Sequence, residues 1–112
     1  MTYDEDLADC IRELLADDAD VTETRMFGGL AFLLGGHMAI AASGQGGALV
    51  RVDPATSDRL TARTKAQPAI MRGRPMAGWL RLESSDLRTK RQLARWVDLA
   101  CIYARSLPPK RR

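Results

Sequence analysis

The sequence predicts a two-layer α+β domain in which one antiparallel sheet packs against an N-terminal and a C-terminal helix. Apolar residues recur with a helical period near both ends of the chain, and short apolar or β-branched runs separated by glycine turns fill the stretch between them. Strands joined by tight turns must pair antiparallel. The expected order of elements is α-β-β-β(-β)-α-β(-β)-α.

The first helix is expected to begin near Tyr3, because Thr2 and Glu5 stand in the capping-box relation. It is expected to end near Asp17-Asp18, because acidic side chains at a helix C-terminus oppose the macrodipole. Its expected apolar stripe comprises Leu7, Cys10, Ile11, Leu14 and Leu15.

Strands are expected next, because four short runs are rich in β-branched or apolar residues. The adjacent glycines Gly35 and Gly36 favour a type I′ hairpin, since both central positions of that turn need positive φ. A second glycine-rich turn covers residues 43–47. The four expected strands cover residues 21–25, 30–34, 37–42 and 48–52.

A short helix is expected over residues 55–63, because Asp53-Pro54 combines an N-cap residue with the residue favoured at the first helical position. Residues 64–77 are expected to be largely irregular, with a brief edge strand over residues 69–72, and a further strand follows over residues 79–83. The residues that interrupt regular structure are Pro68, Gly73 and Pro75.

The last helix is the clearest element, with Ser85 or Asp86 as its expected N-cap and Pro108-Pro109 as its expected end. Its apolar stripe spans four turns and comprises Leu93, Trp96, Val97, Ala100, Cys101, Ala104 and Leu107.

The composition indicates a globular protein, with 46% hydrophobic and 28% charged residues. No apolar run is long enough to cross a membrane, and the acidic start of the chain is unlike a secretory signal, so we expect a cytoplasmic protein. Cys10 and Cys101 are interpreted as buried free thiols, and whether they lie near each other stays open.

The charge is uneven along the chain. Residues 1–20 hold eight acids and one base, for a net −7, whereas the remainder holds sixteen bases and six acids, for a net +10. This asymmetry fits an anionic partner, but it fits equally an internal match between an acidic helix and a basic surface. The candidate basic patch for a nucleic acid comprises Arg88, Lys90, Arg91 and Arg95.

No recognisable catalytic, cofactor or metal site is expected. His37 is the only histidine, and no carboxylate lies between Glu23 and Asp53 in the sequence, so His37 is interpreted as a turn residue. The glycine clusters lead into strands and lack the Lys-Ser/Thr pair of a phosphate loop. An enzyme with an unrecognised site near His37 stays an alternative.

Residues 71–79 bring arginine, methionine and tryptophan together around flexible and rigid backbone positions. These residue types are common anchors of protein interfaces. Met76 and Trp79 fill the core in one interpretation, and in the other they belong to an exposed surface with Arg72 and Arg74.

Several motifs resemble the TfoX/Sxy N-terminal domain. They are Thr22-Glu23-Thr24-Arg25-Met26-Phe27-Gly28-Gly29-Leu30-Ala31-Phe32, Gly73-Arg74-Pro75-Met76-Ala77-Gly78-Trp79, the start at residues 3–7 and the ending at residues 104–108. The resemblance implies an α+β fold and a family whose best-known members regulate natural competence and carry a separate C-terminal domain. It implies here a standalone domain over residues 1–107, with a basic tail at residues 108–112.

We therefore expect a non-enzymatic regulatory or adaptor module that acts through protein–protein contacts. Weak nucleic-acid binding through the basic C-terminal half is the alternative, and a homodimer through an exposed sheet edge stays open. The candidate interaction surface comprises Arg25, Phe27, Gly28, Gly29, Arg72, Arg74, Met76 and Trp79.

Overall fold

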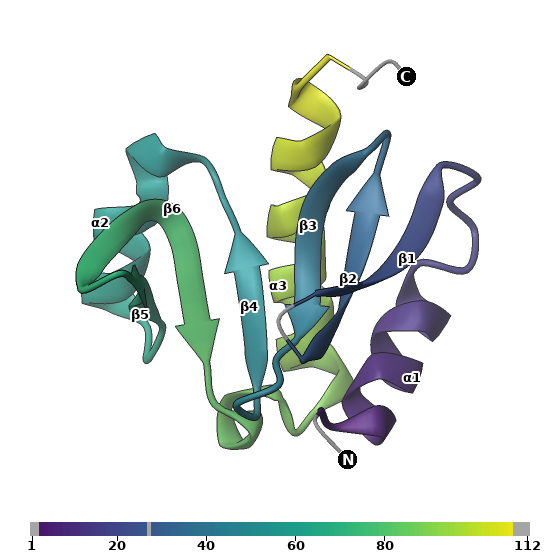
Figure 1. The fold of residues 1–112 in the computed structure, drawn as a ribbon, viewed down its shortest axis with the longest axis horizontal. Helices are drawn as coiled ribbons and strands as arrows, with labels where there is room; N and C mark the ends of the chain where they lie inside the picture. The colour runs from purple at the N-terminus through teal and green to yellow at the C-terminus, as the bar shows by residue number, and fades with distance from the viewer. Residues whose placement is uncertain (1–2, 27, 109–112) are drawn as a thin grey trace.

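The computed structural model describes residues 3–26 and 28–108, so that Thr2, Phe27 and most of the basic tail lie outside the described residues. Six strands form one antiparallel sheet in the order β1-β2-β3-β4-β6-β5. The helices α1 (Glu5–Leu14) and α3 (Lys90–Ser106) pack on one face of this sheet and contact each other, and α2 (Pro54–Arg63) packs against β6 (Figure 1). The predicted two-layer α+β fold is confirmed. The strands are β1 (Val21–Met26), β2 (Gly29–Leu34), β3 (His37–Ala42), β4 (Ala48–Arg51), β5 (Gln67–Met71) and β6 (Arg74–Leu82).

Helix α1 begins later than predicted, and its apolar stripe packs against the core as predicted except at Cys10. Its N-cap is Asp4, whose carboxylate accepts a hydrogen bond from the backbone N–H of Leu7 at 3.1 Å. The prediction that Cys10 is buried was wrong, because the side chain is exposed. The buried side of the helix includes Ala8 along with Leu7 and Ile11, and it is therefore rotated away from Cys10.

The hairpin between β2 and β3 confirms the predicted glycine turn. Gly35 and Gly36 both have positive φ, at 58° and 85°, and Leu34 pairs with His37 across the turn. The register of the two strands shifts between Phe32 and Leu33, and Phe32 and Ile40 pair with each other and are fully buried.

Residues 64–77 are more regular than predicted. Strands β5 and β6 form a long hairpin, and its turn has positive φ at Arg72 and Gly73. The prolines do not prevent this pairing, because each removes only one donor at a position that tolerates the loss. Pro68 lies in the edge strand β5, and Pro75 lies in the part of β6 beyond its pairing with β4.

The N-cap predicted for the last helix was wrong. Ser85 and Asp86 lie in a short 3₁₀ helix, η1 (Ser84–Leu87), and α3 begins after Thr89. Thr89 and Gln92 form a full capping box, with the Thr89 hydroxyl accepting from the Gln92 backbone N–H at 3.1 Å. The apolar stripe is buried as predicted except for Leu107, which is half-buried after the end of the helix.

The core lies between the helical layer and one face of the sheet. Its largest fully buried side chains come from both layers and include Ile11, Phe32, Ile40, Val50, Leu80 and Leu82. Among the described residues, no helix has the length and apolar character to cross a membrane.

Candidate functional site: the uncovered face of the sheet

The face of the sheet opposite α1 and α3 carries a pocket of about 540 Å³, called here the sheet-face pocket. The side-chain alternation of β4 and β6 explains it. Val50 pairs with Leu80 and both point into the core, whereas Arg51 pairs with Trp79 and both point to the other face. Its principal lining side chains are Leu33, Met38, Leu49, Arg51, Ile70, Met76, Trp79 and Arg81.

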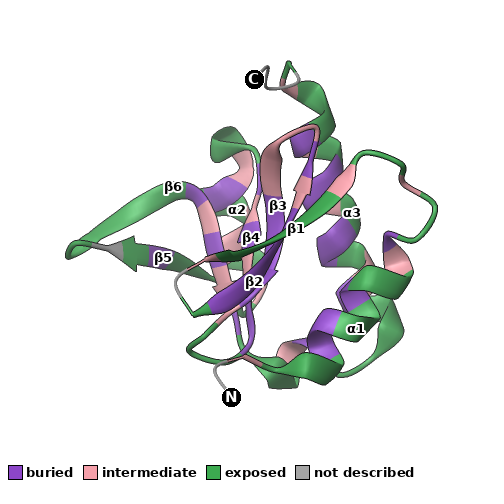
Figure 2. Ribbon diagram, turned by 45° about the vertical axis from the view of Figure 1, so that its right-hand side comes forward, coloured by how far each residue is buried: buried purple, intermediate pink, exposed green. Residues whose placement is uncertain are grey.

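The walls of the pocket are mostly apolar and continue onto the surface. Ile70 and Met76 are 61% and 37% exposed, and they line the pocket on the β5–β6 hairpin. Figure 2 shows this hairpin extending away from the core, with its outer part exposed. Large exposed apolar side chains that gather beside a concavity are typical of a binding surface.

The guanidinium group of Arg51 lies beside two aromatic rings, of which Trp79 lines the pocket and Tyr103 does not. The carbon of its guanidinium group lies 5.2 Å from the ring centroid of Trp79 and 5.4 Å from that of Tyr103. Both distances are within the range of cation–π attraction. Trp79 comes from β6 and Tyr103 comes from the last turns of α3, so the contact joins the two layers of the fold.

Arg81 is held by the turn between β3 and β4. Its guanidinium group donates to the side-chain oxygen of Gln45 at 2.9 Å and to the carbonyl oxygen of Gly46 at 3.3 Å. A longer contact of 3.4 Å reaches the hydroxyl of Ser43. These partners are neutral, so they orient the guanidinium group without cancelling its charge.

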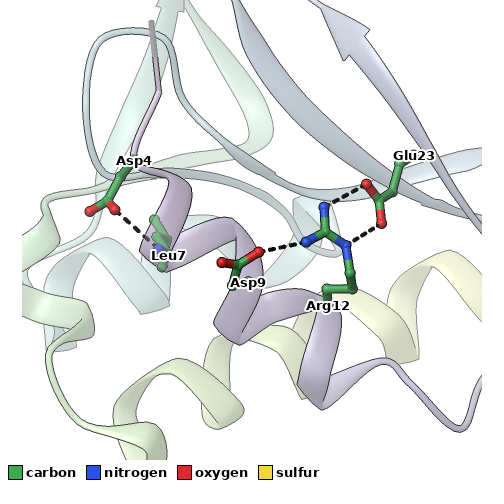
Figure 3. Close-up of polar contacts among 5 residues, drawn as sticks. All are labelled: Asp4, Leu7, Asp9, Arg12 and Glu23. Atoms are coloured by element: carbon green, nitrogen blue, oxygen red, sulfur yellow. Dashed lines mark hydrogen bonds and ion pairs between the residues drawn. The ribbon is translucent and has the colours of Figure 1, made fainter. Parts of the chain in front are cut away.

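Among the described residues, no aspartate or glutamate lines the sheet-face pocket. Acidic side chains gather instead around α1, where Arg12 bonds Asp9 at 2.6 Å and Glu23 at 2.6 and 2.8 Å (Figure 3). The hydrogen bond from Arg12 lowers the pKa of Glu23, and the same contact raises the pKa of Arg12. The pocket therefore carries an uncompensated positive charge.

The acidic first helix also pairs with α3. Glu13 lies 3.9 Å from Lys90, and the carboxylate of Asp18 accepts a hydrogen bond from Arg105. Part of the charge asymmetry in the sequence is thus matched inside the molecule.

The structure brings the two predicted motifs together only in part. Gly29 from the first motif and Met76 and Trp79 from the second line the sheet-face pocket, together with Met26. Met76 and Trp79 therefore belong to a surface rather than to the buried core. The candidate residues that do not line the pocket are Arg25, Gly28, Arg72 and Arg74, all of them exposed.

Sequence reasoning missed Arg51 and Arg81 as site residues. The alternation of Leu49, Val50 and Arg51 already places the first and third side chains on one face of a strand. The pairing that sets Leu49 opposite Arg81 joins distant parts of the chain, so local spacing does not reveal it.

The candidate basic patch lies elsewhere. Arg88, Lys90, Arg91 and Arg95 are all exposed at the start of α3, and none of them lines the sheet-face pocket. Arg91 and Arg95 lie four positions apart on α3 and so share one side of the helix, whereas Arg88 lies before its N-cap Thr89.

His37 and the cysteines also lie outside the pocket. The ring of His37 hydrogen-bonds the carbonyl oxygen of Pro108. Burial raises the pKa of the Cys101 thiol to about 11, and both cysteines are free. Within the described part of the chain, no three His, Cys, Asp or Glu side chains converge as metal ligands.

The comparisons with known proteins bear on the two motifs recognised in the sequence. A search of the curated proteins found no match. The family model of the TfoX N-terminal domain matches residues 13–104, from α1 to the last turns of α3, and so includes both motifs and every strand. The chain belongs to the TfoX N-terminal domain family.

Proposed function

We propose that this domain is a non-enzymatic regulatory or adaptor module that binds a segment of another protein in the sheet-face pocket. The observation that carries the proposal is the apolar pocket itself, open on the face that the helices leave uncovered. Its volume of about 540 Å³ lies in the range of pockets that take several side chains of a ligand.

The residue types of the pocket support a protein partner. Tryptophan and arginine are enriched among the side chains that dominate binding energy at protein interfaces. Met38 and Met76 add flexible side chains that adapt to the shape of a ligand. We also propose a cytoplasmic location, since a reducing compartment keeps the exposed Cys10 a free thiol.

Affinity capture with matched surface variants tests the proposal. Met76→Glu places a charge in the pocket, whereas Ile102→Glu places the same charge on an exposed position of α3, where Ile102 is 67% exposed. We expect wild type and Ile102→Glu to capture a partner protein that Met76→Glu does not capture. Binding between this partner and the domain should then be confirmed with both proteins purified. Equal loss in both variants, or retention by Met76→Glu, would contradict the proposal.

Nucleic-acid binding through the start of α3 is a second candidate function. It rests on the exposed side chains of Arg91 and Arg95, which share one side of α3, and on the exposed Arg88 just before the helix. A labelled duplex should then bind wild type more tightly than Arg91→Gln, and affinity should fall steeply between low and moderate salt. A flat salt response in fluorescence anisotropy would exclude this function.

A further inference from the structure

We propose that the partner segment carries a carboxylate between apolar side chains, and that Arg51 and Arg81 bind this carboxylate. This inference rests on the proposed function and names the chemistry of the segment that enters the sheet-face pocket. The occupant is an acidic, apolar stretch of another protein, such as a glutamate or aspartate flanked by leucine, isoleucine or phenylalanine.

The two arginines lie on the same face of the sheet. Arg51 pairs with Trp79, and Leu49 pairs with Arg81, so the arginines lie diagonally on the adjacent strands β4 and β6. Both line the same pocket on the same face of the sheet. Diagonal neighbours on one face of a sheet are within reach of long side chains, so an acidic segment that lies across β4 and β6 can approach both arginines.

Arg51 has donors that can bind a ligand. The carbon of its guanidinium group lies over the rings of Trp79 and Tyr103, and the group carries five N–H donors. Among the described residues, none accepts a hydrogen bond from Arg51. A planar group with five donors and no acceptor among the described residues is suited to bidentate binding of a carboxylate.

Arg81 is oriented before any ligand arrives. Its contacts with Gln45 and Gly46 fix the guanidinium group against the turn between β3 and β4, and these contacts use only part of its donors. A side chain that is already ordered loses less conformational entropy on binding. Because no described acid lines the pocket, the ligand must supply the compensating negative charge.

The apolar surface favours a chain segment over a compact small molecule. Leu33, Met38 and Leu49 line the pocket from the three strands β2, β3 and β4. Ile70 and Met76 extend the apolar surface along the protruding β5–β6 hairpin, where both are well exposed. A ligand that covers both regions needs apolar groups on each side of its carboxylate, as the side chains of an extended segment provide.

Selection from a library of random peptides, displayed on phage and captured on the intact domain, tests the inference. We expect enriched sequences that contain one acidic residue flanked by large apolar residues. In synthetic peptides of these sequences, replacing the acid by its amide should weaken binding by roughly ten-fold or more, because a charged hydrogen-bonded pair is lost. Fluorescence anisotropy with the labelled peptides measures the dissociation constants.

Variants of the domain assign the carboxylate to its partners. Arg51→Gln and Arg81→Gln should each weaken binding of the acidic peptide strongly and binding of the amide peptide little, whereas Arg63→Gln, at an exposed position of α2, should change neither. Arg51→Lys retains the charge without the planar fork and should fall between wild type and Arg51→Gln. Circular dichroism of each variant shows whether it is folded. The ratio of the dissociation constants of the acidic and amide peptides does not change when part of the protein is uniformly unfolded.

The outcomes separate this inference from the proposed function. The enriched peptides could be apolar and lack an acid, with binding that is lost in Met76→Glu. That result would contradict the proposed carboxylate and would still support protein binding in the sheet-face pocket. Enriched peptides whose binding is unchanged in Met76→Glu, Arg51→Gln and Arg81→Gln bind elsewhere and would overturn both. Failure to enrich any peptide would likewise count against both.

Discussion

At the scale of single residues, two adjacent glycines in the turn before β4 differ sharply in what they tolerate. Gly47 has φ of 68°, and a Cβ built there would lie 2.0 Å from the carbonyl oxygen of Leu82. Gly46 has φ of 91°, but a Cβ there would meet nothing within 4 Å. The first position needs glycine for backbone conformation and space, and the second needs it for backbone conformation alone.

We expect Gly46→Ala to lower the free energy of unfolding by roughly 1–2 kcal/mol, which is the cost of a strained left-handed alanine. Gly47→Ala should cost clearly more, because the strand β6 must also move. Urea unfolding of both variants measures the difference. Equal losses of unfolding free energy in the two variants would contradict the close approach of Gly47 to the end of β6.

The two cysteines should differ in reactivity. Cys10 is exposed on α1, whereas Cys101 is buried on α3 with its pKa raised to about 11. At pH 8 only about one Cys101 thiol in a thousand is then the reactive thiolate, in addition to being shielded from reagents. Alkylation followed by mass spectrometry should modify one site in the native protein and two in urea. Labelling of native Cys10→Ser would contradict the burial of Cys101.

The contact between Arg12 and Glu23 should make stability depend on pH. The pKa of Glu23 is lowered in the folded state, so its contribution is present above the ordinary pKa of glutamate and is lost as the pH falls through the lowered value. We expect Glu23→Gln to lower the urea midpoint slightly at pH 7 and by less near pH 3. Glu83→Gln, at an exposed position, is the control and should change little at either pH.

At the scale of secondary-structure elements, the start of α3 shows how several capping residues compete. Ser85, Asp86 and Thr89 are all suitable N-cap residues, but only Thr89 has a glutamine three positions later to complete the reciprocal pair. We expect Thr89→Ala to cost about 1 kcal/mol of stability and Ser85→Ala to cost much less. Thermal unfolding of the two variants measures the loss of stability. A larger loss in Ser85→Ala would contradict Thr89 as the N-cap and favour the helix start predicted from the sequence.

The hairpin of β5 and β6 shows a second limit of element prediction. Proline and glycine signals over residues 64–77 favoured irregular structure, yet the chain forms an edge strand and the start of a long strand there. A proline forbids a central strand position only where a neighbouring strand needs its N–H. Which side of a strand has a neighbour is decided by the order of the sheet rather than by nearby residues.

At the scale of the whole molecule, the sheet separates a packed face from an open face. Leu80 on β6 is 1% exposed and points to the helical layer, whereas Leu49 on β4 is half-buried and lines the sheet-face pocket. We expect Leu80→Ala to cost about 3 kcal/mol, within the range for removing a buried leucine side chain. Leu49→Ala should cost clearly less while weakening binding in the pocket. Urea unfolding compares the two, and equal losses would contradict an uncovered face.

The class of the fold and most of its elements follow from local patterns in the sequence. The helical period of Leu93, Trp96, Val97 and Ala100 and the glycine pair at residues 35–36 act over a few neighbouring residues, so they can be recognised without knowing the rest of the structure. The same local character let the motif around Met76 and Trp79 be singled out.

Which side chains are exposed, and which of them gather in the sheet-face pocket, depends on long-range packing of the chain. Cys10 proved exposed because helix rotation depends on what packs against the helix, and Met76 and Trp79 proved to line a surface because no helix covers their face of the sheet. Arg51 and Arg81 join the site through the pairing of β4 with β6 across the whole of α2 and β5. Burial and electrostatic environment arise from such long-range contacts, and residue type and spacing do not contain them.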